Sequence, residues 1–190
     1  MKAILIDHDD SFTYNLRHWL KPLCSQIEVF NHQDFFKTAP KIEADTLVVL
    51  SPGPKNPIDY PQTLDWLRSV PKHTPVFGVC LGLQMMAQAL EVSVKPYSPP
   101  LHGKKSALCI LNNDLENLKN KKVARYHSLY CDFESGQNDF EILAVSADDQ
   151  LPMWVKHQTK KWLGVQFHPE SFLTESADLH LQYLNNWLQR

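Results

Sequence analysis

The sequence predicts an α/β fold, namely a doubly wound, mostly parallel open sheet with helices on both faces and a small antiparallel portion in the second half. Nearly continuous apolar runs at residues 2–7, 46–50 and 75–79 are typical of strands buried on both faces. Segments in which apolar residues recur at helical spacing lie between such runs. Later in the chain, several short strand-like runs are separated by short turns, which favours antiparallel pairing.

The chain opens with a predicted strand, a helix and a second strand. Residues 2–7 (KAILID) are an apolar run that ends in an acid. In residues 10–20, apolar side chains recur at helical spacing, and Asp10 and Ser11 are both suited to capping the helix start. Residues 26–30 (QIEVF) alternate as a half-buried strand does.

Two further strands and two helices complete the first half. Residues 46–50 (TLVVL) are β-branched and apolar, which favours a strand. Residues 60–70 form a predicted helix with Pro61 in its first turn, where proline is well tolerated. The apolar run 75–79 is the next strand, and residues 83–90 are good helix formers.

The second half is predicted to contain strands joined by short turns and a closing helix. The strand-like runs are residues 123–126, 140–146, 152–156 and 162–167. Residues 175–188 carry an apolar stripe at helical spacing. Two segments are loop-like in composition, residues 97–100 and 112–122. No linker divides the chain, so residues 1–190 are expected to form one domain.

Composition narrows the classes of partner. The chain has 19 Lys and Arg against 21 Asp and Glu, a net charge of −2, which argues against a nucleic-acid or anionic-membrane binder. No apolar stretch approaches the ~20 residues that a membrane span needs, and the opening residues lack the long apolar region of a signal peptide. The 4 cysteines form no CxxC pair, so we expect no zinc site. We also expect a cytoplasmic protein whose thiols are reduced.

A cysteine between two glycines is the most informative local feature. In residues 76–84 (VFGVCLGLQ), Gly78 and Gly82 flank Cys80 where a predicted strand gives way to a helix. This pattern resembles the nucleophile elbow of hydrolases, a turn so sharp that neighbouring side chains would collide. We therefore predict that Cys80 is a nucleophile, exposed at the carboxyl end of the sheet. The alternative is a buried cysteine that only fills space.

A thiol nucleophile needs a base, and His168 is the best candidate among the 9 histidines. It follows the predicted strand 162–167, so it also lies at a sheet end, and Pro169 favours extended geometry for it. Residues two apart share a face of an extended chain, so Glu170 can approach the imidazole and fix its tautomer. The alternative for this His-Pro-Glu segment is an ordinary surface turn.

Two backbone amides are candidates for stabilising an oxyanion. The N–H of Leu81 directly follows the nucleophile. The segment 51–54 (SPGP) ends a neighbouring strand, and Gly53 allows its backbone to come close to a ligand. We predict that the Gly53 N–H is the second donor; otherwise the segment is simply a rigid turn.

Six ordered motifs together resemble the class I, or triad-type, glutamine amidotransferases, and within them the glutaminase subunits of anthranilate synthase and aminodeoxychorismate synthase. The motifs are residues 7–16 (DHDDSFTYNL), 51–54 (SPGP), 78–82 (GVCLG), 102–104 (HGK), 126–129 (YHSL) and 164–171 (GVQFHPES). The resemblance covers nearly the whole chain, and it implies a flavodoxin-like sheet in a single glutamine amidotransferase type 1 domain, residues 1–190.

The resemblance also implies a mechanism and a partner. Cys80 would attack the carboxamide of L-glutamine, His168 would pass a proton to the departing ammonia, and Glu170 would orient His168. Ammonia would travel to a larger chorismate-binding synthase subunit, with no cofactor and no metal in this chain. The residues that would hold glutamine are Pro52, Gly53, Pro54, Gln84, Ser128 and Leu129. Residues 10–14 and 102–104 are candidates for the subunit interface.

The chain departs from the family pattern at Leu83, where the motif usually has histidine.

Three other functions are alternatives to a glutamine amidotransferase. A phospho-receiver domain is disfavoured because the strand 46–50 ends without the required aspartate. A free-standing γ-glutamyl hydrolase would share the triad and need no partner. A non-catalytic partner-binding subunit is disfavoured by the presence of Cys80, His168 and Glu170.

Overall fold

The computed structural model describes residues 1–134 and 138–190. Within these residues, one large sheet holds β1 (Lys2–Asp7), β2 (Gln26–Asn31), β3 (Thr46–Leu50), β4 (Val76–Val79), β6 (Lys104–Ile110), β7 (Lys122–Arg125), β9 (Phe140–Ser146), β10 (Pro152–His157) and β11 (Trp162–Val165). A separate two-stranded sheet pairs β5 (Ser93–Pro96) with β8 (Leu129–Asp132).

The large sheet has a parallel half and an antiparallel half. Its order is β2-β1-β3-β4-β11-β10-β9-β6-β7, and the first five strands in this order pair in parallel. From β11 to β7 every pairing is antiparallel. The predicted fold class, including the antiparallel portion in the second half, is therefore confirmed.

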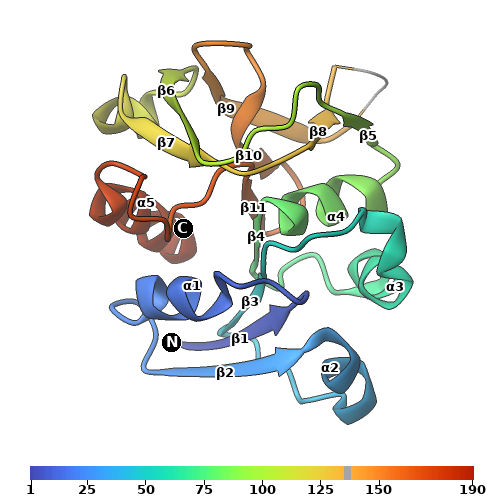
Figure 1. Ribbon diagram of the computed structural model, residues 1–190. Helices are drawn as coiled ribbons and strands as arrows, with labels where there is room; N and C mark the ends of the chain where they lie inside the picture. The colour runs from blue at the N-terminus through green and yellow to red at the C-terminus, as the bar shows by residue number, and fades with distance from the viewer. Residues whose placement is uncertain (135–137) are drawn as a thin grey trace.

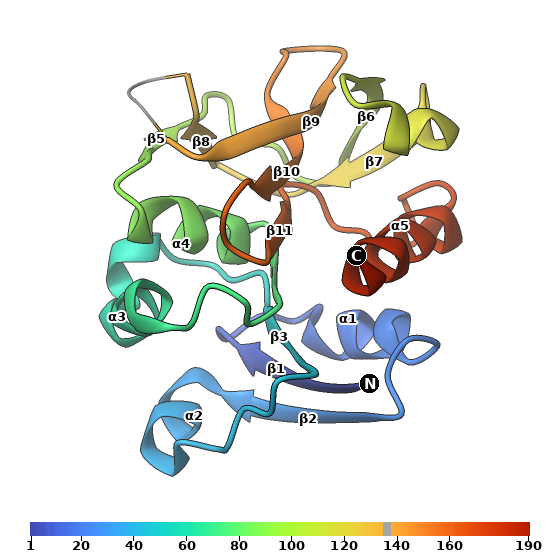
Figure 2. The same ribbon diagram turned by 180° about the vertical axis from the view of Figure 1, so that it is seen from behind.

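Helices cover both faces of the parallel half, as Figures 1 and 2 show. The α-helices are α1 (Thr13–Leu20), α2 (His32–Thr38), α3 (Pro61–Ser69), α4 (Leu81–Ala89) and α5 (Ala177–Gln189), and the 3₁₀ helices are η1 (Pro57–Asp59) and η2 (Asn113–Leu118). Helices α1 and α5 pack on one face, and α2, α3 and α4 pack on the other. None of the helices in the described ranges combines the length and apolar character that a bilayer crossing requires.

Alternation along β1 shows how the sequence builds two cores. Leu5 points into the core beneath α1 and α5, whereas its neighbour Ile6 points into the core beneath α2, α3 and α4. Both side chains are fully buried, and burying each contributes on the order of 2 kcal/mol. A strand buried on both faces gives a firm base for the loops at its carboxyl end, where the candidate site lies.

Several local predictions were incomplete. Residues 112–122 are not simply a loop, because η2 lies within them; the Asn112 side chain accepts the N–H of Asp114 at its start. Helix α1 begins two residues after Ser11, because Asp10 instead accepts the N–H of Phe12 at 2.7 Å in the preceding turn. The pattern also missed α2, β5, β6, β8 and η1.

Candidate active site

Cys80 occupies the turn between β4 and α4 in a strained backbone conformation. Its φ of 51° and ψ of −101° belong to neither strand nor helix. The Cys80 N–H donates to the Val165 carbonyl at 2.7 Å, which ties the turn to β11. A Cβ added at Gly78 would lie 2.6 Å from the carbonyl carbon of Gly82, so the sharp turn requires glycine there. Strain of this kind, held in place by packing, is characteristic of functional positions.

The prediction that Cys80 is exposed was wrong. Its side chain is 5% exposed, even though it stands at the carboxyl end of β4. The Gln166 Nε2 lies 3.5 Å from the Cys80 sulfur and takes part in covering it. The thiol is therefore at the sheet edge that the sequence predicted, but beneath a layer of side chains.

His168 and Glu170 form a buried pair next to this thiol. The His168 Nδ1 and the Glu170 Oε1 are 2.7 Å apart, and the side chains of both residues are almost completely buried. The His168 N–H donates to the Ala124 carbonyl at 3.0 Å, and the Thr174 hydroxyl donates to the His168 carbonyl at 2.6 Å. These bonds fix the backbone on both sides of the imidazole.

Burial and two neighbouring groups set the proton affinity of His168. Burial alone would lower the pKa of its imidazole, but the Glu170 charge and hydrogen bonds with Cys80 and Glu170 outweigh it and hold the pKa well above its usual value. The ring is hydrogen-bonded on one side to Glu170 and on the other to the thiol group, and both contacts favour its protonated form. Such an arrangement stores a proton next to a sulfur nucleophile.

Aromatic rings and a carboxyl group wall the imidazole. Ring centroids of Phe12 and Tyr126 lie 5.5 and 5.0 Å from that of His168. The hydroxyls of Tyr126 and Ser171 share a hydrogen bond at 3.1 Å. Burial raises the pKa of Asp10, whose carboxyl group lies close enough to feel the charges of His168 and Glu170. The motif that contains Asp10 and Phe12 therefore reaches the catalytic groups directly.

The two residues predicted to supply oxyanion donors adjoin each other. A Cβ at Gly53 would lie 2.4 Å from the Leu81 Cδ2 and 2.7 Å from the His8 carbonyl oxygen. His8 also holds the segment 51–54 in place, since its backbone N–H donates to the Ser51 hydroxyl at 2.8 Å. The Tyr60 hydroxyl in turn donates to the His8 carbonyl at 3.1 Å. Burial, assisted by neighbouring His32, lowers the pKa of His8 to about 3, so its ring stays neutral.

Gln84 links the thiol to the segment after Tyr126. Its Nε2 donates to the Leu129 carbonyl at 3.1 Å and to the Gln166 Oε1 at 3.2 Å. Among the other residues predicted to bind substrate, Ser128 and Pro54 are exposed, Leu129 and Gly53 are half-buried and Pro52 is buried. The structure thus brings Gln84 and Leu129 together beside Cys80, with Gln166 between Gln84 and the sulfur.

A buried arginine braces the same segment from behind. Arg125 is 1% exposed and makes a bidentate pair with Asp149 at 2.8 and 3.1 Å. Its Nε donates to the His127 Nε2 at 3.1 Å, and the His127 Nδ1 hydrogen-bonds with the Leu129 carbonyl at 2.8 Å. Burial and the Arg125 charge lower the pKa of His127 to about 4, which keeps the ring neutral as this chain of bonds requires.

Sequence reasoning missed Gln166, His8, Arg125 and Asp10 as parts of the site. Gln166 could have been found, because it lies two residues before His168 and so shares a face with it in an extended chain. The role of Arg125 depends on Asp149, 24 residues away, for which the sequence gives no local signal. Across the described ranges, no group of three or more His, Cys, Asp or Glu side chains is arranged to hold a metal ion.

Known proteins have sequences similar to nearly the whole of this chain. Residues 4–186 match the family model described as glutamine amidotransferase class-I. Aminodeoxychorismate synthase component 2 of Klebsiella aerogenes is 34% identical over 98% of this chain and 99% of its own length. Anthranilate synthase of Azospirillum brasilense is also 34% identical, over all of this chain, but this chain spans only 26% of that protein.

A solved structure supports the fold. The crystal structure of a glutamine amidotransferase from Thermotoga maritima superposes with a TM-score of 0.75 at 16% sequence identity. The match covers 100% of this chain and 99% of the other. At this identity the likeness concerns the arrangement of strands and helices alone.

Proposed function

The chain belongs to the class-I glutamine amidotransferase family, and on that premise we propose that it hydrolyses L-glutamine and delivers the ammonia to a chorismate-using synthase subunit. The observation that carries this proposal is the contact of Cys80, His168 and Glu170 at one end of the sheet. We further propose that residues 1–190 act as one glutaminase domain. Full-length similarity to a protein named as a second synthase component supports both statements.

In the first half of the reaction, the Cys80 sulfur attacks the side-chain carboxamide carbon of glutamine. The backbone N–H groups of Leu81 and Gly53 are the proposed donors to the oxyanion that forms. As the intermediate collapses, the carbon–nitrogen bond breaks and His168 gives its proton to the departing ammonia. A γ-glutamyl thioester on Cys80 remains.

In the second half, water attacks the thioester while His168 takes a proton from it. The sulfur of Cys80 leaves, glutamate is released, and His168 again holds the proton next to the sulfur. Glu170 holds the ring in one tautomer through its 2.7 Å contact with Nδ1 and stabilises the imidazolium in both steps.

The proposed glutamine contacts come from two loops. Pro52, Gly53 and Pro54 wall one side of the site, and the backbone of Ser128 and Leu129 holds the substrate on the other. Gln84 already donates to the Leu129 carbonyl, so we propose that it also aligns this backbone segment for binding. The Arg125–His127 contact supports the same carbonyl from behind.

The Glu170→Gln change is expected to move the pH profile of kcat/KM for glutamine. Because the Glu170 charge raises the pKa of His168, its loss lets burial dominate and the pKa falls. Activity is lost as pH rises through this pKa, since the proton for the departing ammonia is gone. The alkaline limb should therefore shift to lower pH by about one pH unit or more. An unchanged alkaline limb would assign that limb to another group.

The chorismate-using branch rests on the names of the relatives, anthranilate synthase and aminodeoxychorismate synthase component 2. Exposed apolar side chains support a partner at the catalytic edge. Tyr14 is 70% exposed and Phe172 is 89% exposed. In sequence, Tyr14 lies two residues after Phe12, which packs on the His168 ring, and Phe172 directly follows Ser171, which hydrogen-bonds with Tyr126. Apolar residues left bare in this position are suited to a protein interface.

Adding a chorismate-binding synthase subunit should raise glutaminase turnover. Cys80 is covered in the chain alone, so substrate access requires the surrounding side chains to move, and a partner seated on Tyr14 and Phe172 can favour the open arrangement. The measurement is kcat for glutamate release with and without the partner. As a control, Ile58→Ser changes an exposed apolar residue in a segment that contains neither Tyr14 nor Phe172, and it should respond to the partner as the native chain does. No response in the native chain would favour a free-standing γ-glutamyl hydrolase.

A further inference from the structure

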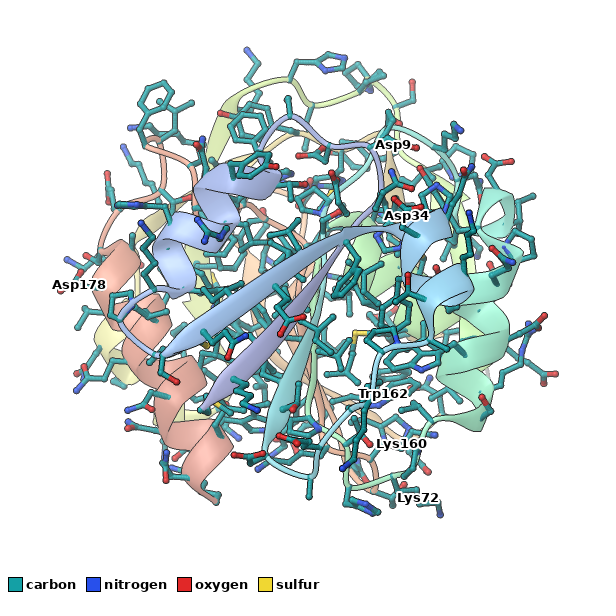
Figure 3. The ribbon with its side chains drawn as sticks, turned by 90° about the horizontal axis from the view of Figure 1, so that it is seen from below. Asp9, Asp34, Lys72, Lys160, Trp162 and Asp178 are labelled. Atoms are coloured by element: carbon teal, nitrogen blue, oxygen red, sulfur yellow. The ribbon has the colours of Figure 1, made fainter. Side chains whose placement is uncertain are left out.

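The end of the sheet opposite Cys80 carries cations that the reaction does not use. Lys72 precedes β4, whereas Lys160 and Lys161 precede β11, and the parallel pairing of these strands brings the two turns together. The Lys161 N–H donates to the Lys72 carbonyl at 2.7 Å. Figure 3 shows Lys72 and Lys160 beside Trp162 at one edge of the molecule, with Asp9 at the opposite edge.

Two adjoining hollows of about 710 and 650 Å³ open at this edge and share the lining residues Lys72, His157, Thr159 and Lys160. Among the described residues, five Lys or Arg side chains line the larger hollow, and Glu141 is the one acidic side chain there. That carboxylate is already paired with Lys156 at 3.0 Å. Arg190, one of the five, is paired with Asp114. Of the described residues that line the smaller hollow, Asp139 alone carries a carboxylate, and it accepts the Thr159 hydroxyl at 3.4 Å.

Neither Lys72 nor Lys160, the two lysines that line both hollows, forms an ion pair with a carboxylate in the part of the chain that the structure describes. The Lys160 Nζ lies 4.6 Å from the centroid of the Trp162 ring, a cation–π contact that holds the ammonium in place. Lys72 and Lys160 line both hollows, and burial and the charge of Lys72 lower the pKa of Lys160. Two like charges that line one hollow favour the binding of an anion there.

His157 adds a nearly buried donor to these charges. Its Nδ1 accepts the backbone N–H groups of Thr159 and Lys160, each at 3.1 Å, so the neutral ring carries its hydrogen on Nε2. Burial lowers the pKa of His157; Asp139 opposes this effect, whereas Lys160 and Lys72 add to it. No acceptor in the described part of the chain takes the Nε2 hydrogen. His157 is 8% exposed and lines both hollows.

We propose that the phosphoryl group of a small molecule binds where the two hollows adjoin, through the ammonium groups of Lys72 and Lys160 and the Nε2–H of His157. A phosphate monoester carries a charge of about −1.5 to −2 at neutral pH and three strong acceptor oxygens. Two cations and one neutral donor match that charge and that number of acceptors. The site is distinct from the Cys80 edge and contributes nothing to the chemistry proposed there.

Titration of the full chain with inorganic phosphate at constant ionic strength tests the proposal, with calorimetry for affinity and ¹⁵N NMR for the His157 ring. We expect saturable binding, a shift of the His157 Nε2–H signal, and a Kd that rises about fivefold in Lys72→Ala and in Lys160→Ala. His157→Phe, which suits the neighbouring Phe140 and Trp162 rings, should weaken binding as well. Cys80→Ser should bind phosphate unchanged.

The control is Lys37→Ala, an exposed lysine of α2 whose loss changes the net charge by the same amount. It should leave the Kd unaltered. Equal weakening by Lys37→Ala and Lys160→Ala would mean non-specific charge attraction, and a linear, non-saturating titration would mean no site; either result overturns the proposal. Replacing phosphate with glycerol phosphate identifies the source, since tighter binding of the ester indicates a phosphorylated metabolite and tighter binding of phosphate indicates the free ion.

Discussion

Cys80→Ser should reduce glutamine hydrolysis by about four orders of magnitude or more while leaving the chain folded and able to bind the proposed synthase subunit. The hydroxyl is a far weaker nucleophile than the thiolate, and the imidazolium of His168 gives no help in ionising it, because its proton is held by the Glu170 charge. The side chain of serine is only slightly smaller than that of cysteine, so the packing around this residue, which is 5% exposed, should be preserved. The measurement is glutamate release, with the thermal midpoint as a check on folding.

Cys109→Ser is the matched control, since Cys109 also carries a free thiol and lies in β6, far along the sheet from β4. It should retain full activity. Hydrolysis that persists in Cys80→Ser would point to another nucleophile. Loss of partner binding together with activity would mean that the strained turn at Cys80 serves the interface rather than the chemistry.

The parallel half of the sheet and the Cys80 turn could be predicted because their signals are local. Strands β1, β3 and β4 are apolar runs buried on both faces, and Gly78 is needed because of contacts with the backbone of Gly82 and Leu83, within three residues of Cys80. The motifs at Cys80 and His168 lie at the ends of strands, so the rule that parallel strands end at one edge was sufficient to bring them together.

The parts that escaped prediction depend on contacts between distant residues. Strand β6 begins with two exposed lysines, and β5 and β8 are only four residues each, so none shows a clear apolar alternation. Arg125 is buried because Ser106, Ser146 and Asp149 surround its guanidinium, and each lies at least 19 residues away. Burial of Cys80 likewise comes from Gln166, on a different strand-to-loop segment. Composition and periodicity carry no signal for such pairings.

Gly82→Ala should destabilise the chain by about 3 kcal/mol or more and inactivate what remains folded. A Cβ at this position would lie 2.4 Å from the Leu50 carbonyl oxygen and 2.8 Å from the Leu50 Cβ. Both atoms belong to β3, which is buried on both faces and cannot retreat. Relief therefore requires the start of α4 to move away from the sheet, and Cys80, directly before that helix, would leave His168. Urea unfolding and kcat on the folded fraction measure the two effects.

Gly164→Ala gives the contrast that makes this argument specific. Its Cβ would lie 2.7 Å from the Leu83 Cδ1, the free end of a side chain, and 3.2 Å from the Gly78 carbonyl oxygen. Rotation of Leu83 and a small backbone adjustment can relieve both contacts, so we expect a loss of about 1 kcal/mol with Cys80 still beside His168. Equal losses of stability in Gly82→Ala and Gly164→Ala would contradict this argument. They would show that α4 can move away from β3 as easily as the Leu83 side chain can rotate, so the close packing of α4 on β3 would not be what holds Cys80 in place.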